Sequence, residues 1–192
     1  MSVPEVAGRA YREGLPALTA SLVGGLLAGV VLGGMRGDFA RIDGLLVLVP
    51  ALLATRGNVY GSLGARLATG LHQGLVAPRI RGDERLSRAV AAALSNGLLA
   101  SGFAAVAAWL LLSTLGRSVA PLPVLLGIAL LAGLLSGIVL SLSVVLVVFA
   151  GYRRGYNPDT LVGPIVTTAG DVFGVAFLLL AVRIITTLPG VG

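Results

Sequence analysis

Five long apolar segments, separated by short polar loops, are the feature that most constrains this chain. They extend over about 15–34, 42–75, 86–115, 121–150 and 158–188. Each reaches the roughly 20 apolar residues that a helix needs to cross a bilayer. Only 11% of the 192 residues are charged, against about 25% in an ordinary soluble domain. We therefore predict one all-α, polytopic membrane domain over residues 1–192, with five transmembrane helices.

The distribution of arginine predicts the orientation. All 14 basic residues are arginines, and they lie between the apolar segments rather than in one patch, which argues against nucleic acid as a partner. With the N-terminus inside, the inner segments hold Arg9, Arg12, Arg79, Arg81, Arg85, Arg88, Arg153 and Arg154, and the outer segments hold Arg36, Arg41, Arg117 and Arg183. Because arginine favours cytoplasmic loops, we predict a cytoplasmic N-terminus and an external C-terminus in the plasma membrane of a prokaryote, surrounded by lipid.

Several kinds of chemistry are disfavoured by composition. The chain has no cysteine and one histidine, His72, so thiolate chemistry is excluded and a zinc site is not expected. No Ser/His or His/Glu constellation is present, and one chain offers no second intramembrane carboxylate to pair with Asp171. We expect neither an enzyme nor a bound cofactor.

Glycines recur at every fourth residue and predict helix packing. They form the sets Gly25, Gly29 and Gly33; Gly57 and Gly61; Gly70 and Gly74; and Gly133 and Gly137. Small residues at this spacing let helices approach closely in lipid. Asp43, Asp83 and Asn157 stand where side chains cap helix N-termini, and we predict that role for each.

The fifth apolar segment carries a carboxylate at membrane depth. Asp171 lies 12 residues after Asp159, which is about 18 Å along a helix and near the middle of a ~30 Å hydrocarbon core. Pro164, Thr167 and Thr168 fall on the same side by their three- and four-residue spacing. Carboxylate, hydroxyl and spare carbonyl oxygens are ligands for a hard cation. An intramembrane carboxylate of this kind predicts an ion path.

The second apolar segment offers a polar match at similar depth. Asn58 follows Pro50 and the run from Thr55 to Gly57, and we predict that the helix kinks and unwinds there, since irregular backbone at this depth is tolerated where it lines a cavity. An alternative remains open for Asp171, which could neutralise Arg56 or Arg66 in a structural pair. Otherwise, both arginines are expected to be structural or to snorkel.

Two runs carry a resemblance to a known family. The run PALLATRGNVYGSLGARLAT at residues 50–69 resembles the second-helix signature of the MgtE-type magnesium transporters, especially the branch of the animal solute-carrier relatives. The run NPDTLVGPIVTTAGDVFG at residues 157–174 resembles the fifth-helix signature, and REGLP at residues 12–16 also fits. The resemblance covers essentially the whole chain as one five-helix unit.

The resemblance implies a dimer with a central pore lined by the second and fifth helices. It places Asp171, Asn58, Thr167 and Thr168 around a largely hydrated magnesium ion, with manganese or cobalt as other possible cargo. Only about 14 residues precede the first apolar segment, so no cytoplasmic sensing domain is expected. The second unit would come from a homodimer or from another half-size chain.

Charge counting independently favours pairing, because two Asp171 carboxylates across a twofold axis would balance one divalent cation. Three functions stay open from the sequence. They are a divalent-cation channel or transporter, a sodium-coupled magnesium exchanger, and a membrane scaffold subunit without transport.

Overall fold

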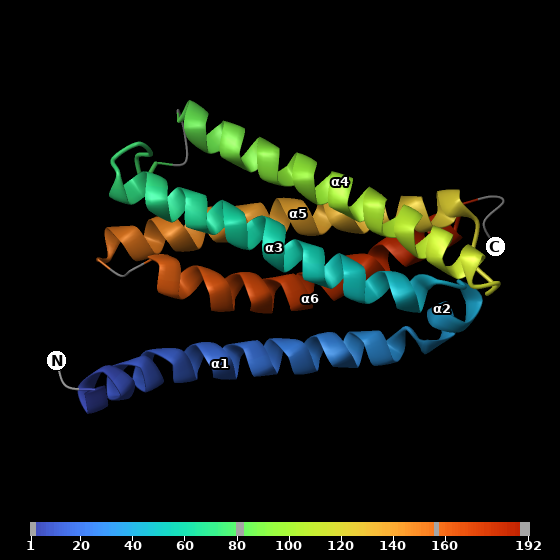
Figure 1. The fold of residues 1–192 in the computed structure, drawn as a ribbon, viewed down its shortest axis with the longest axis horizontal. Helices are drawn as coiled ribbons and strands as arrows, with labels where there is room; N and C mark the ends of the chain where they lie inside the picture. Colours follow the sequence, from blue (N-terminus) through green and yellow to red (C-terminus); the bar gives the residue numbers. More distant parts are fainter. Residues whose placement is uncertain (1–2, 80–82, 156–157, 189–192) are drawn as a thin grey trace.

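Long helices lie side by side along the molecule in the computed structural model, which describes residues 3–79, 83–155 and 158–188 (Figure 1). The helices are α1 (Val3–Gly34), α2 (Arg36–Arg41), α3 (Leu45–His72), α4 (Glu84–Thr114), α5 (Leu122–Arg153) and α6 (Pro158–Thr186). All except α2 run most of the length of the bundle. Helix α1 begins at one end of the bundle and α6 finishes at the other.

The composition of the helices identifies a membrane protein. Helices α3, α4 and α5 and residues Val162–Thr186 of α6 are long and apolar enough to cross a bilayer. Helix α1 carries a shorter apolar stretch, Leu18–Gly34. Leucines and valines on the outer side of α1 are exposed, among them Leu18, Leu22, Leu26 and Val30, so this side is available to lipid or to another helix. The chain is thus a multi-pass membrane protein.

Helix α5 lies at the centre of the packing. It contacts α3, α4 and α6, whereas α1 packs mainly against α6. The core forms two apolar clusters, one toward α2 around Leu48, Leu52 and Ile128, and one toward the opposite end around Leu67 and Val144. Helix α3 contributes to both clusters, so the middle of α3 lies where one ends and the other begins.

The expected break in the second long helix is wrong. Helix α3 is continuous from Leu45 to His72, through Pro50 and through the segment Thr55–Asn58. The Thr55 hydroxyl donates to the Leu52 carbonyl at 3.0 Å, inside the same turn. Continuity has a physical reason, because each backbone group released by unwinding in lipid would need a new partner.

The helix ends also depart from the predicted bounds. Helix α1 begins at Val3, not near residue 15, because its polar first turns include good helix formers and a proline in the first turn. The short α2 between α1 and α3 was not predicted. It ends at a tight turn where Gly44 adopts a φ of 93°, and a Cβ there would come within 3.0 Å of Leu112.

One of the three predicted caps is confirmed. Asp83 caps α4, accepting hydrogen bonds from the backbone N–H groups of Arg85 and Leu86 at 2.9 and 3.2 Å. Asp43 does not cap α3, whose N-cap is Gly44 with no side-chain hydrogen bond. The positive φ of Gly44 makes the turn without a polar side chain. Asn157 lies outside the described residues.

The glycine sets divide into packed and open ones. A Cβ on Gly133 or Gly137 of α5 would collide with Ser101 of α4 or Tyr60 of α3, so these glycines do pack helices together. For Gly25, Gly29, Gly33, Gly57 and Gly61, by contrast, an added Cβ would have no neighbouring atom of the described chain within 4 Å. The prediction that these sets pack helices is therefore wrong within one chain. Helix α1 instead meets α6 through Gly24, whose added Cβ would lie 2.6 Å from the Thr168 methyl group.

Candidate functional site

The predicted carboxylate lies in the middle of α6. Asp171 is 13 residues after Pro158 and 15 before Thr186, the two ends of the helix. Its side chain is partly buried. Within the described residues it forms no ion pair with Arg56 or Arg66, since the ion pair found there joins Arg88 and Glu84. The structural pairing that the sequence left open is not made here, and Asp171 remains available to a cation.

Two hydroxyls lie within one turn of this carboxylate. Thr167 donates to the Gly163 carbonyl at 2.9 Å, and Thr168 donates to the Pro164 carbonyl at 2.8 Å. These bonds use the hydroxyl protons, so the oxygen lone pairs remain as acceptors. The Thr168 hydroxyl also lies 3.2 Å from Ser21 of α1. Thr167 is exposed, whereas Thr168 points toward α1, and only Thr167 faces outward.

Asn58 lies apart from the three residues of α6. It is exposed on α3 and lines a pocket of about 240 Å³ between α3 and α4. The polar lining comprises Asn58, Ser62, Arg66 and Asn96, and none of the lining residues belongs to α6. The four predicted ligands are thus not brought around one cavity by a single chain.

Two polar residues of this pocket, Ser62 and Asn96, were not predicted from the sequence. Ser62 and Arg66 follow Asn58 at intervals of four, which places the three residues on one face of α3. Asn96 faces them from α4. The available signal was an amide inside an apolar helix, where polar side chains are uncommon.

Of the two roles predicted for Arg56, structural or snorkelling to the membrane surface, the structure contradicts snorkelling. Its exposed fraction is 4%, and none of its three guanidinium nitrogens has a hydrogen-bond partner in the part of the chain that the structure describes. One guanidinium nitrogen lies against Gly174 of α6, where a side chain would collide with it. Snorkelling fails because Arg56 is 11 residues inside α3 and faces another helix. Arg66, in contrast, is exposed.

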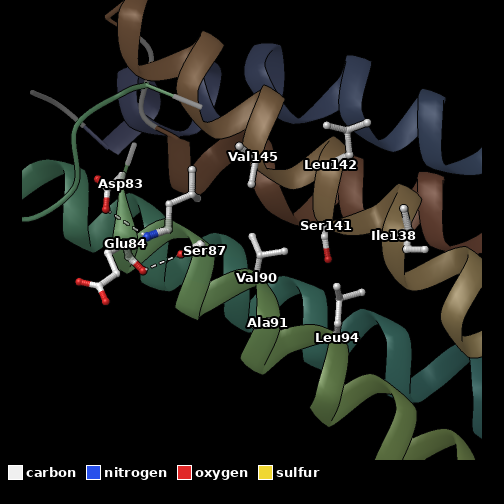
Figure 2. Close-up of a pocket in the computed structure, with 11 residues that line it drawn as sticks. Asp83, Glu84, Ser87, Val90, Ala91, Leu94, Ile138, Ser141, Leu142 and Val145 are labelled. Atoms are coloured by element: carbon white, nitrogen blue, oxygen red, sulfur yellow. Dashed lines mark hydrogen bonds between the residues drawn. The ribbon is translucent and has the colours of Figure 1, made fainter. Parts of the chain in front are cut away.

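A wider cavity of about 710 Å³ lies between α4 and α5 (Figure 2). Most of its lining is apolar, including Val90, Leu94, Leu142 and Val145. The charged residues Asp83 and Glu84 occur at one end only, as Figure 2 shows. The backbone N–H of Leu86, together with those of Ala77 and Arg85, holds the pKa of Asp83 below its usual range. A cavity lined in this way offers no continuous path for a hydrated cation.

The described residues contain no cluster of three histidine, aspartate or glutamate side chains able to hold a metal ion. A tight dehydrated cage is therefore absent from the described part of one chain. What the chain offers is one carboxylate with neutral oxygens beside it, which suits an ion that keeps part of its water shell.

Comparison with known proteins assigns the family. The family model MgtE, described as a divalent cation transporter, matches residues 49–181, which include α3 from Val49 and α6 as far as Ala181. The chain belongs to the MgtE family. Both signature runs lie within this range, so the resemblance drawn from them is confirmed.

Curated relatives of this MgtE-family chain include members of solute carrier family 41. Member 3 from Rattus norvegicus is 27% identical over 145 residues, covering 74% of this chain and 31% of the relative. Member 2 from Homo sapiens is 30% identical over 148 residues, covering 73% and 25%. Member 2 from Xenopus laevis is 29% identical over the same length, with the same two shares. The chain therefore spans about a quarter to a third of these relatives. No solved structure matches it significantly.

Proposed function

We propose that this chain transports divalent cations, with magnesium as the main cargo, through a path that uses Asp171. The observation that carries the proposal is a half-buried carboxylate at the middle of α6, without an ion pair among the described residues, in a chain of the divalent cation transporter family. Charged groups at this depth are costly and mark ion pathways. The neutral oxygens of Thr167, Thr168 and Asn58 complete the proposed lining.

A second copy of the chain supplies the other half of the path in this proposal. One Asp171 balances half the charge of a divalent ion, and twofold homodimers are the commonest oligomers. The exposed Asn58 and Thr167 support this arrangement, as do Gly57, Gly61 and Gly163, none of which would contact the described chain through an added Cβ. A partner helix can approach closely at such positions.

Magnesium fits this lining better than calcium does. Magnesium gives up water reluctantly and usually meets one or two carboxylates, whereas calcium takes six to eight oxygen ligands. Two carboxylates and several neutral oxygens hold a partly hydrated ion. Manganese and cobalt are further candidate cargo.

The proposed topology has five spans, with the N-terminus in the cytoplasm and the C-terminus outside, in a prokaryotic plasma membrane. The arginine distribution supports this orientation. Gln73→Cys and Ser118→Cys test it, because both positions are exposed and lie in connections at opposite ends of the bundle. The first should react with thiol reagents from the cytoplasmic side and the second from outside, and the reverse labelling contradicts the orientation.

Asp171→Asn tests the proposed function. The change is nearly isosteric and removes one negative charge per chain, so we expect a folded protein whose magnesium affinity falls at least about a hundredfold, or about 2.8 kcal/mol. Magnesium is titrated by calorimetry, and uptake is measured in proteoliposomes. Asp43→Asn is the matched control, because it removes the same charge from an exposed position near α2.

The results separate this proposal from the other two functions. Unchanged binding and flux in Asp171→Asn would sink the assignment of the carboxylate. Flux that requires a sodium gradient would indicate coupled exchange, and absence of flux in the parent would indicate a scaffold.

A further inference from the structure

Arg56 is a buried positive charge whose guanidinium has no acceptor where it lies. It is more than nine-tenths buried, and its Nε, Nη1 and Nη2 atoms lack hydrogen-bond partners among the residues that the structure describes. An isolated charge in such surroundings is strongly unfavourable. An arginine cannot relieve this by losing its proton. The side chain therefore needs an anionic or polar partner in at least one state of the protein.

The partner must belong to the same chain. With 4% of its surface exposed, Arg56 is closed to lipid phosphates and to a second subunit. The clusters on either side of it, represented by Leu52 and Leu63 on α3, are apolar except for the Tyr60 hydroxyl, a neutral group that makes no hydrogen bond to Arg56. Backbone carbonyls in the middle of these helices are already hydrogen-bonded within the helix.

Asp171 is the carboxylate that the register of the helices brings to this level. Gly64 of α3 meets Val162 of α6, and the guanidinium of Arg56 meets Gly174. Helices α3 and α6 run in opposite directions (Figure 1), so these two contacts place the Arg56 backbone level with the segment that contains Asp171. Asp171 and Gly174 are three residues apart and thus neighbours on the helix surface. The other acidic residue of α6, Asp159, is in its first turn, far from this level.

We propose that Arg56 acts as a tethered cation that competes with the transported ion for Asp171. When the path is empty, the guanidinium turns to Asp171 and neutralises it. In the second arrangement, the guanidinium lies in the notch at Gly174, as it does in this structure, and leaves Asp171 free for a divalent ion. Arg56 is a positioning and specificity residue, and this role rests on the proposed function of Asp171.

The competition has two consequences for transport. It weakens binding, because an entering ion must displace the guanidinium and remain near its positive charge. It also hastens release, because the returning guanidinium takes the place of the departing ion. A divalent ion attracts the carboxylate about twice as strongly as a monovalent ion at the same distance, so the guanidinium excludes monovalent ions more effectively.

Arg56→Gln tests the proposal, with magnesium as the probe and the full-length chain in detergent and in proteoliposomes. We expect the magnesium Kd to fall about tenfold, which corresponds to about 1.4 kcal/mol, together with lower KM and lower maximal flux. Arg56→Lys keeps the positive charge and should remain near the parent. Arg183→Gln is the matched control, since it removes the same charge from an exposed position of α6.

Gly174→Ala probes the notch without changing any charge. The added methyl group would collide with the guanidinium and keep it from withdrawing, so the magnesium Kd should rise. Combining it with Arg56→Gln should remove that rise, because the colliding group is gone. An unchanged magnesium Kd in Gly174→Ala would contradict the proposal that the guanidinium occupies the notch at Gly174 when Asp171 holds the ion.

A merely structural arginine gives a different pattern. Weaker or unchanged magnesium binding in Arg56→Gln would overturn the proposal. A variant that fails to fold, or that unfolds at a lower temperature, would overturn it as well. These results are distinct from failure of the proposed function. If Asp171→Asn abolishes binding while Arg56→Gln leaves it unchanged, only the competition is wrong. If Asp171→Asn binds magnesium normally, the site itself is wrong.

Discussion

Two regions of the bundle use glycine in opposite ways. In the packed seam, formed where α5 meets α3 and α4, Gly97, Gly133 and Gly137 make room for Ser101 and for the ring of Tyr60. On the open face, formed by the outward sides of α1, α3 and α6, an added Cβ on Gly29, Gly57 or Gly163 would have no neighbouring atom of the described chain within 4 Å. The open face also carries the exposed Thr167 and the partly buried Asp171.

The difference separates stability from function. In the seam, a side chain in place of glycine would displace an element of the core, so these positions maintain the fold. On the open face, the chain places small residues where its own packing does not need them. Such residues are useful where another helix or an ion approaches.

Gly137→Leu should have the largest effect on folding. Even the first carbon of the new side chain would collide with the Tyr60 hydroxyl and lie 3.2 Å from Leu94. Overpacking of a core costs roughly 1–3 kcal/mol and sometimes more. We expect a clearly lower thermal midpoint by circular dichroism in detergent. An unchanged midpoint would show that the packed seam can rearrange to accommodate the leucine. The two regions would then not differ in their need for glycine.

Gly29→Leu is the matching change on the open face. An added side chain meets no described atom of the same chain, so the unfolding free energy of the monomer should change by less than about 0.5 kcal/mol. The dimer fraction in light scattering should fall, because the leucine would separate α1 from a partner helix. A normal dimer fraction would show that this part of α1 faces lipid.

The sequence predicted the elements better than their contacts. Apolar length located the helices, since a bilayer imposes a minimum span. Residue spacing shows which side chains share a helix face, but it cannot show what that face meets. The sets containing Gly29 and Gly137 look alike in sequence, yet only the second packs inside the chain.

The candidate site could be predicted in the same partial way. Asp171 was identified from its depth, which follows from counting along a helix. The direction of Arg56 could not be identified, because its contact with Gly174 depends on the register between α3 and α6. Asn58 was predicted beside Asp171, but its pocket is formed with α4 instead.

Asp83→Ala should have a smaller effect, at the end of the packed seam where α4 begins. The change removes acceptors for the backbone N–H groups of Arg85 and Leu86, and the thermal midpoint at pH 7 should fall modestly. Because the pKa of Asp83 is lowered in the folded state, its contribution is complete above the ordinary aspartate pKa of about 3.9. It is lost as the pH falls through the lowered pKa.

The difference in midpoint between Asp83→Ala and the parent should therefore be constant near neutrality and should narrow in acid. Thermal unfolding followed from pH 7 to acid checks this. A difference that stays the same throughout would show that the cap acts through packing and not through its charge. Glu84→Gln is a useful control, since Glu84 is exposed and pairs with Arg88 on the same helix.

Ser141→Ala should have the smallest effect, although Ser141 is buried in the packed seam. Its hydroxyl oxygen has no hydrogen-bond partner among the described residues and points into the apolar cavity between α4 and α5 (Figure 2). Removing an unsatisfied buried hydroxyl relieves a desolvation cost, so the midpoint should stay unchanged or rise slightly. Ser136→Ala is the matched control on α5, because the Ser136 hydroxyl donates to the Ala132 carbonyl at 2.5 Å and so has the partner that the Ser141 hydroxyl lacks; its loss should not raise the midpoint. A larger fall in the thermal midpoint for Ser141→Ala than for Ser136→Ala would mean that the cavity holds a hydrogen-bond partner for the Ser141 hydroxyl. The packed seam would then be more polar than its lining indicates.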